Sequence, residues 1–144
     1  MLQIIIDTRE QTPWHFPEGT AEVSRGCISA GDYAVKGDQF NFAIERKSLD
    51  DFVGTISTGW DRFQAELARM IGFPAMVVIV EGSFFEINHF HYNHPQVRPG
   101  FVCKQIALLT LQGVAVLFCD NPILAAGMCW RILLERKAAI DASD

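Results

Sequence analysis

The chain has 144 residues, of which 49% are hydrophobic and 20% are charged, and its formal net charge is −5. These values are typical of one globular domain, and no apolar run reaches the ~18 residues that a membrane-spanning helix needs. The negative charge argues against a protein that coats nucleic acid by bulk electrostatics, although it permits an enzyme that contacts DNA through a few cations and a metal ion. We therefore expect a single cytoplasmic domain over residues 1–144, with no membrane segment.

Strands dominate the first third of the sequence. The apolar run 2–6 predicts a buried strand that ends at Asp7, and this run is too short for a secretory signal. A turn-rich loop follows over 8–20, punctuated by Pro13 and Pro17, and a short strand is expected over 21–26. Residues 31–35 and 39–47 are expected to form a hairpin around a turn at 36–39, and a helix should begin at Ser48.

Helices and covered strands alternate in the remainder of the chain. Apolar residues at helical spacing predict a helix over 60–71, and continuous apolar runs predict buried strands over 75–82 and 113–120. A loop is expected over 83–100, then a helix over 101–112. Asn121 caps the last expected helix, which has Pro122 at its first position and runs to about Ile140. This order predicts a three-layer α/β domain whose sheet is mixed because of the early hairpin.

The run Glu45-Arg46-Lys47 ends one of the expected strands. Side chains alternate along a strand, so Glu45 and Lys47 should share one face, while Arg46 starts on the other face. Hairpin pairing would bring Asp32 close to Glu45. Two carboxylates beside a lysine suit Mg²⁺, which prefers oxygen ligands, and the lysine can orient or deprotonate a water that attacks a phosphodiester. Asp7, at another strand end, is a candidate third carboxylate.

A simpler interpretation of this run has to be weighed. A lone Glu-x-Lys on a strand is usually a solvated pair, and the spacing from Asp32 to Glu45 occurs by chance in many proteins. The same letters recur at Glu135-Arg136-Lys137. In a helix successive residues turn by about 100°, so Glu135 and Lys137 should diverge. The expected role of this second run is solubility and, for Arg136 and Lys137, a favourable interaction with the helix C-terminus.

Several short motifs occur together in a definite order. They are Asp7-Thr8-Arg9-Glu10, Gly31-Asp32-Tyr33, Ile44-Glu45-Arg46-Lys47 with Asp51 four residues after the lysine, Arg62-Phe63, VVIVEG over 77–82 and GVAVLFCDNPILAA over 113–126. In this order they resemble the nuclease domain of the XPF family, whose motif reads hydrophobic-E-R-K-x-x-x-D. That family is a branch of the restriction-endonuclease-like PD-(D/E)-x-K superfamily, and the resemblance covers nearly the whole chain.

The resemblance implies a role for each matching residue. Asp32 and Glu45 would bind Mg²⁺, for which Mn²⁺ can substitute, with the backbone carbonyl of Arg46 as a third ligand and Asp7 as a further candidate. Lys47 would position the water, and Asp7 and Asp51 would belong to the same acidic cluster. Arg46 would contact a phosphate or hold the site together. Contacts with DNA are expected from Arg9, Arg46, Arg62 and Arg69.

Some of these residues also have structural explanations. Ser48 and Asp51 have the spacing of a helix cap, and Arg62 and Glu66 have the spacing of an ion pair on one helix face. The family often has Gln near the position of Glu66. Arg9 can simply order the loop after the first strand. The remaining conspicuous residues are expected to be structural, namely Trp14, Phe16, Cys119 and Cys129 in the core, Glu81 at a strand end, and His89, His91 and His94 in a loop whose spacing fits no common metal site.

We therefore expect a Mg²⁺-dependent DNA endonuclease with a restriction-endonuclease-like fold. Branched, flap or four-way DNA is the expected substrate class. The length resembles stand-alone phage and bacterial forms, without the helicase-like or helix-hairpin-helix domains of other members. The alternatives are a non-catalytic DNA-binding or scaffolding subunit and a phosphodiesterase with another substrate. The last helix is apolar on more than one face, so we expect a homodimer or pairing with another subunit.

Overall fold

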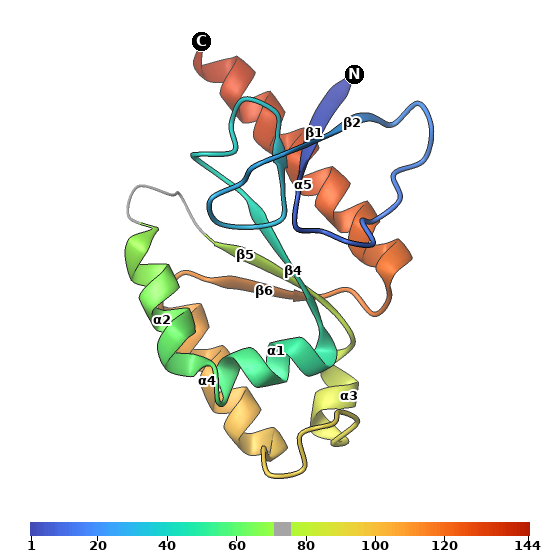
Figure 1. Ribbon diagram of the computed structural model, residues 1–144. Coiled ribbons are helices and arrows are strands. Elements are labelled where there is room, and N and C mark those ends of the chain that lie inside the picture. The colour runs from blue at the N-terminus through green and yellow to red at the C-terminus, as the bar shows by residue number, and fades with distance from the viewer. Residues whose placement is uncertain (71–75) are drawn as a thin grey trace.

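The computed structural model describes residues 1–70 and 76–144 and contains a six-stranded mixed sheet flanked by helices (Figure 1). The strands are β1 (Leu2–Asp7), β2 (Ala21–Gly26), β3 (Tyr33–Val35), β4 (Ile44–Ser48), β5 (Val77–Glu81) and β6 (Ala115–Phe118). The helices are α1 (Leu49–Ile56), α2 (Trp60–Arg69), α3 (Phe84–Asn88), α4 (Pro99–Leu111) and α5 (Pro122–Ser143). The strand order is β2-β1-β3-β4-β5-β6, which confirms the expected α/β class and mixed sheet.

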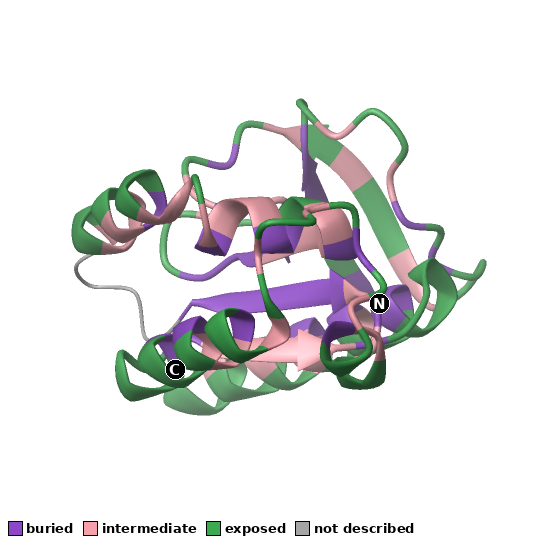
Figure 2. Cartoon of the chain, turned by 90° about the horizontal axis from the view of Figure 1, so that it is seen from below, coloured by how far each residue is buried: buried purple, intermediate pink, exposed green. Residues whose placement is uncertain are grey.

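Two hydrophobic clusters cover the two faces of the sheet. On one face α5 contributes Ala125, Cys129 and Leu133, which pack on strand residues such as Ile4 and Ile79. On the other face lie residues of α1, α2, α3 and α4, together with Val78 and Val80 of β5. Figure 2 shows the buried strands between helices whose outer sides are exposed. Helices on both faces explain why β5 is a continuous apolar run.

The other residues that the sequence placed in the core are also buried. Trp14 and Phe16 pack in the cluster beneath α5. The Trp14 ring stacks on the Tyr33 ring, and the Phe16 ring makes an edge contact with it. Cys119 and Cys129 belong to the same cluster. These positions confirm the core role predicted for all four residues.

The element boundaries agree with the sequence predictions except in two places. The expected loop over 83–100 contains the short helix α3, whose cap is Ser83 paired reciprocally with Glu86. The expected strand over 39–47 begins only at Ile44, because residues 38–43 form turns in which Asp38 accepts backbone N–H groups from Asn41 and Phe42. The ends predicted at residues 71 and 75 lie outside the described residues.

The strands β3 and β4 run antiparallel, and one residue pair, Tyr33 with Ile44, joins them. Gly31 makes their close approach possible. It has a φ of 117°, and a Cβ at this position would lie 2.6 Å from the Cβ of Ala43. Only glycine fits such a backbone at such a distance. This contact sets the position of the next residue, Asp32.

Within the part of the chain that the structure describes, none of the helices combines the length and the apolar character that crossing a membrane requires.

Candidate active site

Asp32 is fixed to β4 by two hydrogen bonds. Its backbone N–H donates to the carbonyl of Ile44 at 2.8 Å, and its carboxylate accepts the backbone N–H of Arg46 at 2.8 Å. Glu45 lies between these two β4 residues. The hairpin contact therefore places the two carboxylates next to each other, as the spacing of Asp32 and Glu45 predicted, although the paired region is shorter than expected.

Glu45 and Lys47 lie on the same face of β4, as strand alternation predicted. The Nζ of Lys47 is 3.8 Å from Oε1 of Glu45, and both side chains are about a quarter or less exposed. Burial and the charge of Asp32 raise the pKa of Glu45 to about 8, against the opposing effect of Lys47. Burial also raises the pKa of Asp32. Burial and mutual repulsion therefore make it unfavourable for both carboxylates to be ionised at the same time, because one lysine does not neutralise two negative charges.

This donor set fits a hard divalent cation. Carboxylate oxygens suit Mg²⁺, which keeps several waters and takes only one or two carboxylates from a protein. Among residues 1–70 and 76–144, no three His, Cys, Asp or Glu side chains converge as a complete ligand set. Asp32 and Glu45 would leave the remaining positions to water, to a phosphate oxygen and to the carbonyl of Arg46.

The side chain of Arg46 is engaged with protein groups on the other side of β4. Its Nε is 2.7 Å from Oε1 of Glu81, and its Nη1 is 3.2 Å from Oε2 of Glu10 and 2.8 Å from the carbonyl oxygen of Thr12. The guanidinium also lies 4.9 Å from the centre of the Trp14 ring. Of the two roles considered for Arg46, these contacts fit holding the site together. They leave the guanidinium little freedom to bind a DNA phosphate.

Asp7, predicted as a further metal ligand, has both carboxylate oxygens engaged by protein groups. Its side chain is 1% exposed, and its Oδ2 pairs with Nε of Arg9 at 2.5 Å. Its Oδ1 accepts the backbone N–H of Ile28 at 2.9 Å. Burial alone would raise the pKa of Asp7, but the hydrogen bonds from Arg9 and Ile28 outweigh it and lower the pKa. Because both oxygens are occupied, Asp7 orders the segment after β1.

Two hollows flank the carboxylates and together form a cleft. The first has a volume of about 430 Å³ and is lined by Glu45, Lys47, Asp50, Asp51, Gly54, Thr55, Thr58, Gly59, Arg62, Phe63, Glu66 and His94. The second has a volume of about 640 Å³ and is lined by Arg9, Ser29, Ala30, Gly31, Asp32, Glu45, Glu66, Arg69, Met70 and Met76. Glu45 and Glu66 border both hollows. Three of the four arginines predicted to contact DNA line the cleft, and Arg46 does not.

Comparison with known proteins assigns the family. The family model described as the ERCC4 domain matches residues 6–129. This chain belongs to the ERCC4 domain family. The ERCC4 family is a family of DNA nucleases, and its nucleases typically use a divalent metal. The match includes both carboxylates, Lys47 and all three cleft arginines.

A solved structure gives the same assignment at the level of the fold. The XPF from Aeropyrum pernix superposes on this ERCC4 domain with a TM-score of 0.71 and 20% sequence identity. The match covers 93% of this chain and 61% of that one, so the chain spans about three fifths of the length of its solved relative. Among curated proteins, none matches the sequence.

The remaining predicted residues of the ERCC4 domain lie at the edges of the cleft. Ser48 caps α1 by accepting the backbone N–H of Asp51 at 3.1 Å, which confirms the cap, and the carboxylate of Asp51 borders the first hollow. Glu66, whose role the sequence left open, raises the pKa of Glu45 through its charge. Sequence reasoning missed the network of Glu10 and Tyr33 around Arg46, since its members come from three separate segments.

Proposed function

We propose that this ERCC4 domain is a metal-dependent DNA endonuclease and that Asp32, Glu45 and Lys47 are its catalytic residues. The observation that carries the proposal is their meeting point: two partly buried carboxylates and one lysine lie where two hollows lined by arginines join. A non-catalytic member would have no need of two adjacent, partly buried carboxylates whose pKa values are raised, one of them by the charge of the other, since this arrangement costs stability unless a cation binds.

Each residue has a distinct chemical task in this proposal. A bound Mg²⁺ or Mn²⁺ would supply Lewis-acid stabilisation of charge on the phosphate. Asp32 and Glu45, with the carbonyl of Arg46, would hold that ion. Lys47, within 3.8 Å of Glu45, orients the attacking water, and its amine accepts the proton of that water when the amine is in its neutral form. Arg9, Arg62 and Arg69 contact phosphates on the two sides of the scissile bond.

The substrate class is DNA, and we propose that branched, flap or four-way DNA is preferred. Such a preference suits a role in DNA repair or recombination. A cytoplasmic setting is consistent with four free cysteines, two of them buried. The runner-up functions, a scaffolding subunit or a phosphodiesterase with another substrate, are distinguished by the same experiment.

The test is cleavage of labelled duplex, single-stranded, flap and four-way DNA with Mg²⁺, with Mn²⁺ and with a chelator. We expect cleavage only with a divalent ion. The variant Glu45→Gln should bind DNA in chelator as the original chain does, yet show no cleavage, because the amide keeps the shape and loses the charge that holds the ion. Asp32→Asn should behave alike. Full activity of folded Glu45→Gln would reject the site, and binding without cleavage by the unchanged chain would favour the scaffolding function.

We also propose that the chain forms a homodimer through α5. The inner side of this helix is buried against the sheet, but Ile123, Leu124 and Met128 on its first turns are 84%, 54% and 41% exposed. Such a row of apolar side chains is costly to leave in water. Light scattering at micromolar concentration should give twice the mass of one chain, and Leu124→Glu should give the monomer. If the original chain also has the mass of a monomer at this concentration, the homodimer proposal fails.

A further inference from the structure

Three aromatic rings form an exposed cluster at the end of α3. The rings of Phe85 and His89 stack with their centres 3.8 Å apart and an angle of 21° between their planes. His91 approaches both, with its ring centre 6.2 Å from that of Phe85 and 5.9 Å from that of His89. Phe85 is 61% exposed, and both histidines are exposed. We call these three residues the aromatic cluster.

The local backbone holds the cluster toward solvent. The backbone N–H of His89 and its ring Nδ1 both bond to the carbonyl of Phe85, at 3.0 Å and 2.9 Å, which fixes the ring over its neighbour. Phe90 has a φ of 61°, a left-handed conformation that non-glycine residues rarely adopt. Its ring turns away and stacks on Tyr92 at 5.0 Å. The reversal at Phe90 therefore leaves the flanking histidines on the outside.

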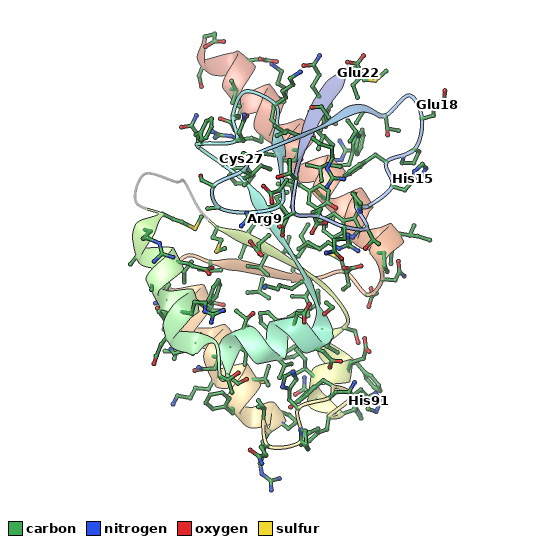
Figure 3. All side chains as sticks on the ribbon, in the orientation of Figure 1. Arg9, His15, Glu18, Glu22, Cys27 and His91 are labelled. Carbon is green, nitrogen blue, oxygen red and sulfur yellow. The ribbon has the colours of Figure 1, made fainter. Side chains whose placement is uncertain are left out.

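The loop that carries the cluster is joined to the wall of the catalytic cleft. The backbone N–H and the side-chain amide of Asn93 bond to the two carboxylate oxygens of Asp50 at 2.8 Å and 3.0 Å. The ring Nε2 of His94 bonds to the backbone carbonyl of Asp50 at 2.9 Å, and both residues line the first hollow. Figure 3 shows His91 beside α3. The loop that follows the cluster thus borders the hollow that Lys47 lines.

We propose that the aromatic cluster is a stacking platform for unpaired bases of a single-stranded DNA segment that leaves the cleft. This inference rests on the proposed nuclease function. Every base has a flat π face, so exposed rings bind single strands with little regard to sequence. Paired bases in a duplex are stacked on one another and cannot use such a platform. The cluster would therefore favour substrates with an unpaired arm.

The test measures DNA binding in chelator at low salt by fluorescence anisotropy, so that it needs no catalysis. The probes are a labelled single-stranded oligonucleotide and a labelled blunt duplex of the same length. Phe85→Ala and His89→Ala should each weaken single-strand binding by about fivefold to a hundredfold, the range for losing one base–aromatic stack, and should leave duplex binding unchanged. Phe85→Trp should keep or strengthen single-strand binding.

Phe84 offers a matched control on the same helix. It is 51% exposed, but its ring lies against Phe118 at 5.9 Å instead of joining the cluster. Phe84→Ala should therefore bind both probes as the original chain does. Unchanged single-strand binding by folded Phe85→Ala, or an equal loss in Phe84→Ala, would overturn the platform and leave the cluster as a surface for a protein partner.

The outcome is separable from that of the proposed function. If Glu45→Gln stops cleavage while Phe85→Ala binds single strands normally, only the platform fails. If the unchanged chain never cleaves DNA but its single-strand binding depends on Phe85, only the catalytic proposal fails.

Discussion

The two Glu-Arg-Lys runs have the same letters and opposite architecture. In β4 the outer residues Glu45 and Lys47 meet over the cleft at 3.8 Å, while Arg46 points to the other side. In α5 the outer residues Glu135 and Lys137 separate and pair along the helix with Arg131 and Asp141. A period of two brings the first and third residues together, and a period of 3.6 parts them. Secondary structure, not composition, decides which run can do chemistry.

The middle arginines of the two runs, Arg46 and Arg136, both bond to carboxylates that are distant in the sequence. Arg136 forms two hydrogen bonds with the carboxylate of Asp38, at 2.8 Å and 3.0 Å, and its guanidinium lies 5.4 Å from the Phe42 ring. It thus holds the turn that enters β4, while Arg46 holds the segments around its exit. The predicted interaction of Arg136 and Lys137 with the helix C-terminus is wrong, because α5 continues to Ser143.

The two lysines should show the largest contrast. Lys47→Ala should lower the single-turnover cleavage rate by about 10²–10⁴, the usual cost of losing a positioned proton-transfer group. Lys137→Ala should leave the rate unchanged, because its amine pairs with Asp141 on the surface, 3.0 Å away. Both variants would be compared at saturating metal after circular dichroism has shown that they fold. Equal effects would mean that the shared strand face has no bearing on catalysis.

The two arginines should differ in stability. Arg46→Ala should lower the free energy of unfolding by about 3 kcal/mol, because it leaves Glu10 and Glu81 partly buried without their cation. Arg136→Ala should cost about 1–2 kcal/mol, since its guanidinium bonds to one carboxylate, that of Asp38, instead of two. Urea unfolding in chelator measures both. A larger loss for Arg136→Ala would reverse the assigned order, and a loss of cleavage per folded molecule in that variant would contradict a purely structural role.

Substitution of the two glutamates should affect the free energy of unfolding differently: at high pH Glu45→Gln should raise it, and Glu135→Gln should leave it almost unchanged. Glu45 has a pKa of about 8 against an ordinary value of 4.5, so the folded chain holds a proton that the unfolded chain has released between these values. Its contribution to stability is therefore complete below about pH 4.5 and is lost as the pH rises through 8. At pH 8 and above, Glu45→Gln should raise the free energy of unfolding of the metal-free chain by about 1–2 kcal/mol.

Glu135→Gln is the matched control for this measurement. Its carboxylate is exposed and pairs with Arg131 at 3.4 Å, so the change should stay within about 0.5 kcal/mol at every pH. Saturating Mg²⁺ should stabilise the original chain and not Glu45→Gln. Stabilisation by Mg²⁺ that survives the substitution would place the ion elsewhere.

Local patterns predicted the fold well where each element has its own signal. The apolar run of β5 and the Asn121-Pro122 start of α5 needed no distant partner, and both appear as expected. The segment 39–43 was mistaken for strand because Phe40 and Phe42 alternate with polar residues. The structure makes it a turn whose Asp38 is held by Arg136, at a sequence separation of 98. Such long-range pairs leave no periodic trace in the sequence.

The same distinction applies to the site. The proximity of Glu45 and Lys47 follows from strand period alone, and the structure has it. Whether the Asp7 carboxylate is free to bind a ligand depends on the backbone N–H of Ile28, which donates to it. Whether Arg46 is free depends on Glu81, which lies 35 residues further along the chain. Carboxylates and guanidiniums satisfied by distant partners look identical, in sequence, to those left for a metal or for DNA.

The join between β3 and β4 has a consequence for motion within the native state. One residue pair links these strands, whereas five link β4 to β5, and two further bonds to Asp32 complete the join. Hydrogen exchange should therefore detect opening here well before global unfolding, with the amide protons of Asp32 and Arg46 as reporters. A metal ion bound by both Asp32 and Glu45 would connect β3 to β4 and should slow the exchange of these two amide protons.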